Sequence, residues 1–411
     1  MKNHESLTDS YPTAILARQP IFDYNLRVFA YELLFRNSST DFCANINADA
    51  ADLATAKVIN YAFLEIGMDR VLGDHTGFVN LTRSFLLSDD PFPLAKERVV
   101  LEILEDIEPD EEVIAAVKNL VKQGYLIALD DFIFSPSLLP LVELATIIKV
   151  DVLSMTNEEL AEHVQILRKY PVRLLAEKVE TNDQFNYCRK LGFDLFQGYF
   201  FSKPSIIEDK VIPARQQQLL SLIAKLQDPD IEFDEIETLI SQDPGLLYKL
   251  TRLLNSAAVG LNKHIDSVKH ALVFLGINAI KTWTTIIAMN EIDSIPDELM
   301  TAALIRGKMC EKIAPAYGYP ENLGFLAGLF SNLDLMLNRP MDELLKGIPL
   351  NDEIILALTN HGGLLGKMLD DVVAYKTGHW DCVNEDFASL EAFANIYVDA
   401  VEWANLTNKG F

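Results

Sequence analysis

Short apolar runs alternate with longer amphipathic stretches through the first half of the chain. Eight runs have the length and apolar content of buried strands: residues 15–22, 28–35, 77–82, 98–104, 126–132, 147–153, 173–180 and 195–201. The stretches between most of them have helical periodicity, clearest at residues 48–66, 110–122, 157–169 and 182–191. Residues 23–27 are too few for a helix, so the first two runs should form an antiparallel hairpin. The pattern predicts a closed, modified (β/α)8 barrel with one antiparallel strand.

Beyond residue 207 the pattern becomes mostly helical. Helices are predicted over residues 217–226, 233–242, 246–254, 268–275 and 277–289. A short polar junction at residues 208–213 separates the two patterns. We therefore expect an α/β barrel domain over residues 1–206 and an all-α domain over residues 207–411.

Polar side chains follow the apolar part of seven of the predicted strands. They are Glu32, Asn80, Glu102, Asp130 with Asp131, Lys149, Glu177 and Gln197. Because the carboxyl ends of barrel strands converge on one mouth, these side chains are expected to share a site. A single polar residue at a strand end is usually structural, but seven such ends together favour a functional site. The adjacent carboxylates of Asp130 and Asp131 need a cation after a buried strand, and a divalent metal is the usual one.

The amino-acid composition and net charge limit the classes of molecule that the protein is expected to bind. The chain of 411 residues is 49% hydrophobic and 23% charged, with a formal net charge of −25. Nucleic acid is thus disfavoured as a partner, and an anionic ligand would need a local metal ion or arginine. The four cysteines lie far apart, and residues 1–11 lack the apolar core of a signal peptide. No stretch approaches the roughly 18 apolar residues of a membrane span, so a cytoplasmic protein is expected.

Several motifs give residues 12–206 a family resemblance. They are Gln19-Pro20-Ile21, Glu32-Leu33-Leu34 with Arg36, Asn80-Leu81, Glu102, Asp130-Asp131-Phe132, Lys149-Val150-Asp151, Glu177 and Gln197-Gly198-Tyr199. Together they resemble the EAL family of cyclic-di-GMP phosphodiesterases, which are barrels with one antiparallel strand. Leu33 stands where the family motif has alanine, so the motif is degenerate.

The resemblance implies a role for each of these residues. Glu32, Asn80, Glu102 and Asp130 would hold one Mg²⁺ or Mn²⁺ ion, and Asp130, Asp131 and Glu177 would help to hold a second. Lys149 and Glu177 would be catalytic, with Lys149 orienting the water that attacks phosphorus. Arg36 would bind a phosphate, and Gln19 and Gln197 would face the guanine edges of cyclic-di-GMP.

Two departures from the family pattern predict weak or conditional hydrolysis. The chain continues from Asp130-Asp131-Phe132 with residues 133–137, Ile-Phe-Ser-Pro-Ser, where the family has a glycine-containing loop. Pro136 fixes its own φ and restricts its neighbour, so this loop should follow a different path beside the metals. Lys178 replaces a glycine next to Glu177, and its charge could compete with the second metal.

The helical half contains the segments Asp243-Pro244-Gly245-Leu246, Leu254-Asn255-Ser256-Ala257-Ala258 and Ile265-Asp266-Ser267-Val268. By these segments it resembles the HDOD domain, a relative of HD metal-dependent phosphohydrolases, most strongly over residues 240–290. Ser331 and Asn332 stand where those hydrolases have a His-Asp metal pair, and they make poor metal ligands. This half is therefore expected to be a catalytically empty module that contacts a protein partner, and a homodimer is one arrangement open to it.

Three hypotheses remain at this point. The chain is a metal-dependent cyclic-di-GMP phosphodiesterase, a non-catalytic cyclic-di-GMP receptor, or a scaffold with a blocked pocket. The retained mouth residues disfavour the scaffold, because a barrel without ligands has no physical need of clustered acids. The sequence does not decide between the first two.

Overall fold

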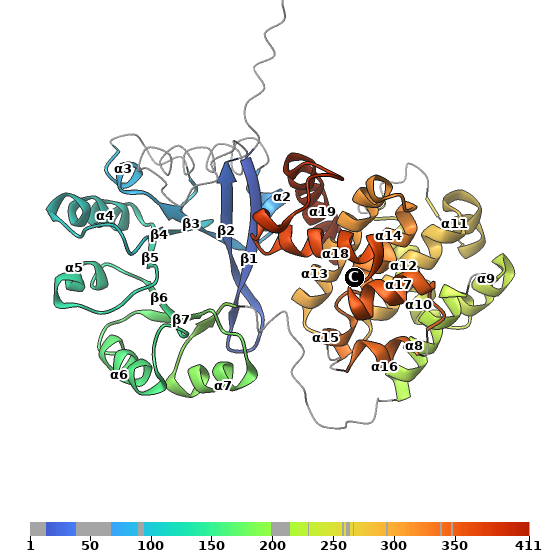
Figure 1. Ribbon diagram of the computed structural model, residues 1–411, viewed down its shortest axis with the longest axis horizontal. Helices are drawn as coiled ribbons and strands as arrows, with labels where there is room; N and C mark the ends of the chain where they lie inside the picture. The colour runs from blue at the N-terminus through green and yellow to red at the C-terminus, as the bar shows by residue number, and fades with distance from the viewer. Residues whose placement is uncertain are drawn as a thin grey trace, which may run out of the picture.

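The computed structural model describes residues 14–37, 67–88, 94–198, 214–228, 230–256, 259, 264–265, 267–292, 295–337, 339–346 and 348–410. It consists of a barrel and a helical half, with the β1 and β2 side of the barrel turned toward the helices (Figure 1). The predicted fold class, a barrel followed by a helical region, is confirmed.

The N-terminal half is a closed eight-stranded barrel. Its strands are β1 (Ala14–Asp23), β2 (Val28–Asn37), β3 (Thr76–Leu81), β4 (Val99–Ile103), β5 (Leu126–Leu129), β6 (Ile147–Asp151), β7 (Arg173–Glu177) and β8 (Leu195–Phe196). Strand β1 is antiparallel to both of its neighbours, and the other neighbouring strands are parallel. The predicted hairpin and the single reversed strand are therefore confirmed.

Local sequence signals determine where several of the barrel helices begin. These helices are α2 (Met68–Leu72), α3 (Arg83–Leu86), α4 (Glu111–Gln123), α5 (Leu139–Val142), α6 (Asn157–Leu167) and α7 (Asn182–Leu191). The side chains of Asp110, Thr156 and Thr181 accept hydrogen bonds from the first turns of α4, α6 and α7. The helices predicted over residues 110–122, 157–169 and 182–191 are thus confirmed, while the one predicted over residues 48–66 lies outside the described residues.

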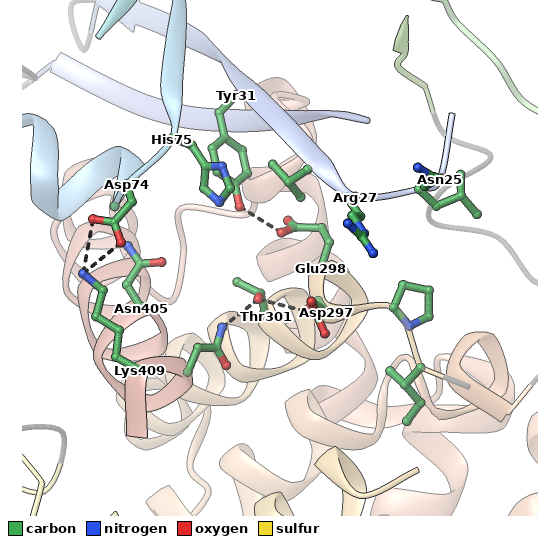
Figure 2. Close-up of a pocket in the computed structure, with 16 residues that line it drawn as sticks. Asn25, Arg27, Tyr31, Asp74, His75, Asp297, Glu298, Thr301, Asn405 and Lys409 are labelled. Atoms are coloured by element: carbon green, nitrogen blue, oxygen red, sulfur yellow. Dashed lines mark hydrogen bonds and ion pairs between the residues drawn. The ribbon is translucent and has the colours of Figure 1, made fainter. Parts of the chain in front are cut away.

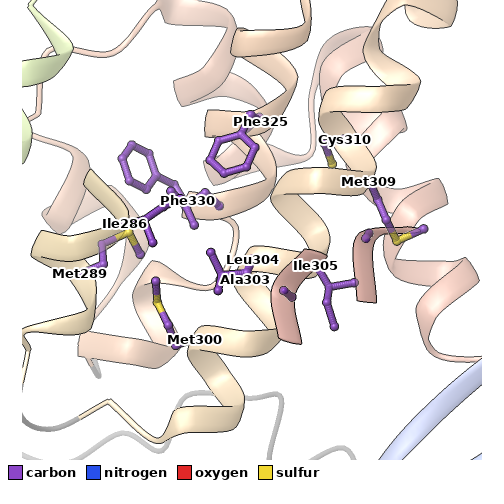
Figure 3. Packing of buried hydrophobic residues seen from close by; sticks show 14 of the residues in the cluster. Ile286, Met289, Met300, Ala303, Leu304, Ile305, Met309, Cys310, Phe325 and Phe330 are labelled. Carbon is purple, nitrogen blue, oxygen red and sulfur yellow. The ribbon is translucent and has the colours of Figure 1, made fainter. Parts of the chain in front are cut away.

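The helical half packs around one apolar core. Its helices are α8 (Ala214–Gln227), α9 (Phe233–Ser241), α10 (Pro244–Leu254), α11 (Val268–Leu275), α12 (Ile277–Asn290), α13 (Asp297–Ile313), α14 (Glu321–Phe330), α15 (Leu333–Leu337), α16 (Met341–Leu345), α17 (Asp352–Asn360), α18 (Gly363–Lys376) and α19 (Leu390–Gly410). Figure 3 shows side chains of α12, α13 and α14 meeting in this core, among them Met289, Leu304 and Phe330. The five predicted helices are present. In the described part of the chain, no helix combines the length and the apolar character that a bilayer crossing requires.

Strand β1 joins the two halves. Its residues Ile15 and Ala17 belong to the apolar core of the helical half, whereas Leu16 belongs to the core of the barrel. The hydroxyl of Tyr375 in α18 donates a 3.0 Å hydrogen bond to the Leu16 carbonyl, and the Arg18 amide donates one of 3.1 Å to the hydroxyl of Tyr397 in α19. Helices α18 and α19 therefore pack directly on the barrel wall.

Glycines allow α13 and α14 to approach closely. A Cβ atom at Gly328 would lie 2.5 Å from the carbonyl oxygen of Arg306 and 2.8 Å from the Cα atom of Gly307. One at Gly324 would lie 2.5 Å from the carbonyl oxygen of Cys310. Since these neighbours are backbone atoms that cannot turn aside, a side chain at either glycine would force the helices apart.

We predict that Gly328→Ala lowers the free energy of unfolding by about 1–3 kcal/mol, the usual cost of overpacking. Gly245→Ala is the matched control, because its Cβ would approach only the carboxylate of Asp243, at 3.2 Å. The control should be neutral or slightly stabilising, since alanine favours helix over glycine by up to about 1 kcal/mol. Thermal unfolding of the full-length variants measures both, and equal midpoints would contradict the close packing described here.

Candidate active site

The ammonium group of Lys149 lies at the centre of the barrel mouth. Lys149 belongs to β6, and its side chain is 1% exposed. Its Nζ atom lies 2.6 Å from Asp130 Oδ1, 2.8 Å from Glu102 Oε1, 2.9 Å from Glu177 Oε1 and 3.5 Å from Glu32 Oε1. These four acids come from β2, β4, β7 and the end of β5. The structure thus brings together five of the side chains that the sequence placed at strand ends.

The charges within this cluster do not balance. Four carboxylates surround one ammonium group, which leaves three negative charges if all of them are ionised. Burial, together with the neighbouring Glu32 and Asp130, raises the pKa of Glu102 well above its usual value, although Lys149 opposes this. Burial likewise raises the pKa of Glu177 to about 8. Burial by itself would lower the pKa of Lys149, but the carboxylates together raise it well above its usual value, so this lysine stays charged.

Several oxygen atoms around the cluster are buried and accept no hydrogen bond from the part of the chain that the structure describes. They are Asn80 Oδ1, Glu102 Oε2, Asp131 Oδ1, Glu177 Oε2 and Gln197 Oε1. Buried polar atoms normally have partners, since leaving one unsatisfied costs about 1–3 kcal/mol. Oxygen atoms without hydrogen bonds, in a cluster with excess negative charge, suit a hard divalent cation such as Mg²⁺ or Mn²⁺.

The arrangement of the acids differs from the metal cage that the sequence led us to expect. Within the described ranges, no three or more His, Cys, Asp or Glu side chains are disposed to hold a metal ion. The carboxylates of Glu32, Glu102, Asp130 and Glu177 converge on the Lys149 ammonium group instead. The donor set nevertheless fits a divalent cation in chemistry and in charge.

The Lys178 side chain forms a second ion cluster at the rim of the mouth. Its ammonium group lies 2.6 Å from Asp151 Oδ2 and 3.5 Å from Asp131 Oδ2. Lys178 and Asp131 both have positive φ values, 56° and 39°, which are unusual for residues with a side chain. Asp131, expected beside the second metal, therefore already has a cation next to it.

The other predicted site residues take different positions. Gln197 is buried and donates a hydrogen bond from Nε2 to Glu32 Oε2, so its amide braces the acid cluster. Gln19 lies opposite Glu32 in the hairpin and lines the cavity at the mouth. Asn80 pairs in register with Glu102. The backbone of Arg36 pairs with Ile15, but the side chain of this predicted phosphate ligand lies outside the described residues.

The mouth opens into a cavity of about 460 Å³ that the helical half helps to enclose. Barrel residues such as Asp130, Lys149 and Glu177 line one side, and Arg306, Lys376 and other residues of the helical half line the other. Sequence reasoning did not identify the helical residues, because helical periodicity shows which face is buried but not what it faces. Only the tertiary contact places them at the site.

Glu298 lines this cavity and also the separate pocket drawn in Figure 2, where it joins the two halves by a hydrogen bond. Tyr31 of β2 donates a 2.8 Å hydrogen bond to Glu298 Oε2 of α13, and the two side chains point toward one another in Figure 2. The guanidinium group of Arg18 lies 4.0 Å from the centroid of the Tyr31 ring. Burial raises the pKa of Glu298, although the nearby Arg18 opposes this. These groups fix α13 against the barrel.

Comparison with known proteins agrees with this architecture. The EAL domain family matches residues 15–204, and the HDOD domain family matches residues 212–381. Cyclic di-GMP phosphodiesterase CdgJ of Vibrio cholerae is 32% identical over 99% of this chain and 96% of its own length. The uncharacterized protein YuxH of Bacillus subtilis is 34% identical over 95% of this chain and 98% of its own length. The chain belongs to the family of proteins that join an EAL domain to an HDOD domain.

We predict that Lys149→Met lowers the free energy of unfolding by about 3–5 kcal/mol, because it leaves four clustered carboxylates without their buried cation. Urea unfolding in the presence of a chelator measures the loss, and added Mg²⁺ should restore part of it by replacing the missing charge. Lys178→Met is the control: its side chain is 51% exposed, so its ion pairs should contribute about 1 kcal/mol or less. Similar losses in the two variants would show that Lys149 does not hold the mouth together.

Proposed function

We propose that the barrel mouth binds cyclic-di-GMP and hydrolyses it weakly with the help of a divalent cation, in bacterial signal transduction. The observation that carries this proposal is the convergence of Glu32, Glu102, Asp130 and Glu177 around Lys149 on the wall of an open cavity. The end-to-end relationship with a cyclic di-GMP phosphodiesterase of Vibrio cholerae supports the choice of substrate.

The roles proposed for the residues follow from their chemistry. Glu32, Asn80, Glu102 and Asp130 would hold a Mg²⁺ or Mn²⁺ ion, and Asp131 and Glu177 would assist with a second. The cations would supply positive charge against the phosphate and acidify water. The Lys149 ammonium group can donate hydrogen bonds but accept none, so its part would be to orient the attacking water and to hold the acids in place. Arg36 would bind a phosphate, and Gln19 and Gln197 would face the bases.

A second function, non-catalytic binding of cyclic-di-GMP, is favoured by one observation. The ammonium group of Lys178 contacts Asp131 and Asp151 at the rim where a second cation would bind. An ammonium group and a divalent cation about 4 Å apart would repel by several kcal/mol at an effective dielectric constant of about 20. The chain would then act as a receptor, with the HDOD domain passing the signal to a protein partner.

Calorimetric titration of the full chain with cyclic-di-GMP in Ca²⁺ tests binding, because Ca²⁺ should support binding without turnover. We expect a single binding event. Absence of heat at high micromolar ligand would contradict both functions.

In Mn²⁺, Glu32→Ala should lower any turnover at least about a hundredfold, since it removes a direct ligand and misplaces its neighbours. Turnover that survives this change would place the chemistry elsewhere.

We predict that Lys178→Gly raises Mn²⁺-supported hydrolysis by about tenfold or more, because it removes a cation beside Asp131. Glycine also adopts the positive φ of this position without strain. Lys178→Asn is the control for charge alone, since asparagine tolerates the left-handed region. If both variants leave turnover flat while a glycine-containing loop in place of residues 133–137 raises it, the loop path limits catalysis instead.

A further inference from the structure

The cavity at the barrel mouth has walls of opposite charge. The barrel side carries the carboxylates of Glu32, Asp130, Asp131, Glu177 and Glu180, with the ammonium groups of Lys149 and Lys178 among them. The side formed by the helical half and β1 carries the cations Arg18, Arg306 and Lys376, with His379 and the single carboxylate Glu298 among its described lining residues. One cavity is therefore lined by an acidic wall from one domain and by a cationic wall contributed largely by the other.

The guanidinium group of Arg306 is held in place by α14 and the residues after it. Its Nη1 atom donates to Ser331 Oγ at 3.3 Å and to Asn332 Oδ1. Ser331 and Asn332 are the two residues expected at the position of the HD metal pair, and here they orient a guanidinium group toward the cavity wall. The close approach of α13 and α14 at Gly328 fixes the backbone of Arg306 at the same point.

Lys376, the last residue of α18, brings a second cation to this wall. Its Nζ atom donates a 3.1 Å hydrogen bond to the carbonyl oxygen of Ala302. Burial lowers the pKa of Lys376 well below its usual value, and the nearby Arg306 and Arg18 lower it further, while Glu298 and Cys310 oppose them. An entering anion opposes this shift, because it supplies an opposite charge that stabilises the protonated amine.

We infer that Arg306 and Lys376 bind one phosphate of the cyclic dinucleotide, so that the ligand bridges the EAL and HDOD domains. This inference rests on the proposed function and adds a second wall to the proposed binding site. Cyclic-di-GMP carries two phosphodiester groups on opposite sides of its ring. The acidic wall with its divalent cation takes one of them, and the cationic wall takes the other. The cavity volume of about 460 Å³ lies within the usual range of about 300–1,000 Å³ for small-molecule sites.

This arrangement gives the HDOD domain a direct part in sensing the nucleotide. Arg306 is on α13 and Lys376 is on α18, two helices that also pack in the core of the helical half. A phosphate bound between them favours the arrangement in which α13 and α18 lie against the mouth. Nucleotide occupancy is thereby coupled to the surface that the helical half presents to a partner.

Calorimetry with cyclic-di-GMP in Ca²⁺, on the full chain, tests this inference. Arg306→Gln and Lys376→Gln should each weaken binding by about tenfold or more, as expected for loss of a hydrogen bond between charged groups. Lys308→Gln is the matched control, because Lys308 is on the same helix but pairs with Glu311 at 2.8 Å and is not among the residues lining the cavity. Arg306→Lys keeps the charge and should lose less affinity than Arg306→Gln.

The outcomes separate this inference from the proposed function. If the wild-type chain does not bind, the proposed function itself fails. If it binds and either glutamine variant binds within about twofold of it, the inference is wrong and the proposed function stands. Should Arg306→Gln unfold at a lower temperature, Lys376→Gln decides alone, because it removes an amine whose described hydrogen bond goes to one carbonyl oxygen.

Discussion

The ion cluster around Lys149 is the interaction on which the barrel mouth depends. Four acids from separate strands could not be buried beside one another without a cation, and Lys149 supplies one from the centre of the group. A buried lysine is equally unfavourable without the acids. Each group therefore requires the others, and the remaining negative charge is what equips the mouth to take a divalent cation. The same interaction holds the strand ends together.

The antiparallel hairpin explains why the second domain reaches this mouth. A parallel strand pair is joined by a crossover helix that covers the barrel, whereas β1 and β2 are joined by a tight turn at residues 24–27. Helices α18 and α19 pack against β1, and Ile15 and Ala17 complete the core of the helical half. The helical half therefore covers part of the barrel wall, and α13 and α18 lie close enough to line the mouth. The two domains share a cavity because they share a strand.

Lys178 places a protein cation at the rim of the mouth. Lys178 keeps the left-handed backbone that glycine would adopt without strain, and it adds an ammonium group beside Asp131 and Asp151. The expected ligands are thus retained while a protein cation sits at the rim.

Much of the fold was predictable because its signals are local. The barrel and its one reversed strand follow from the strand and helix periods, the short turn before Val28 and caps such as Thr156. The site follows from the rule that strand ends converge, which places Glu32, Glu102, Asp130 and Glu177 at one mouth. Only the tertiary structure determines that these acids contact Lys149, and that Arg306 and Lys376 line the same cavity. The physical reason is that a sequence pattern specifies which face of an element is buried, whereas the partner of that face depends on contacts between residues far apart in the chain.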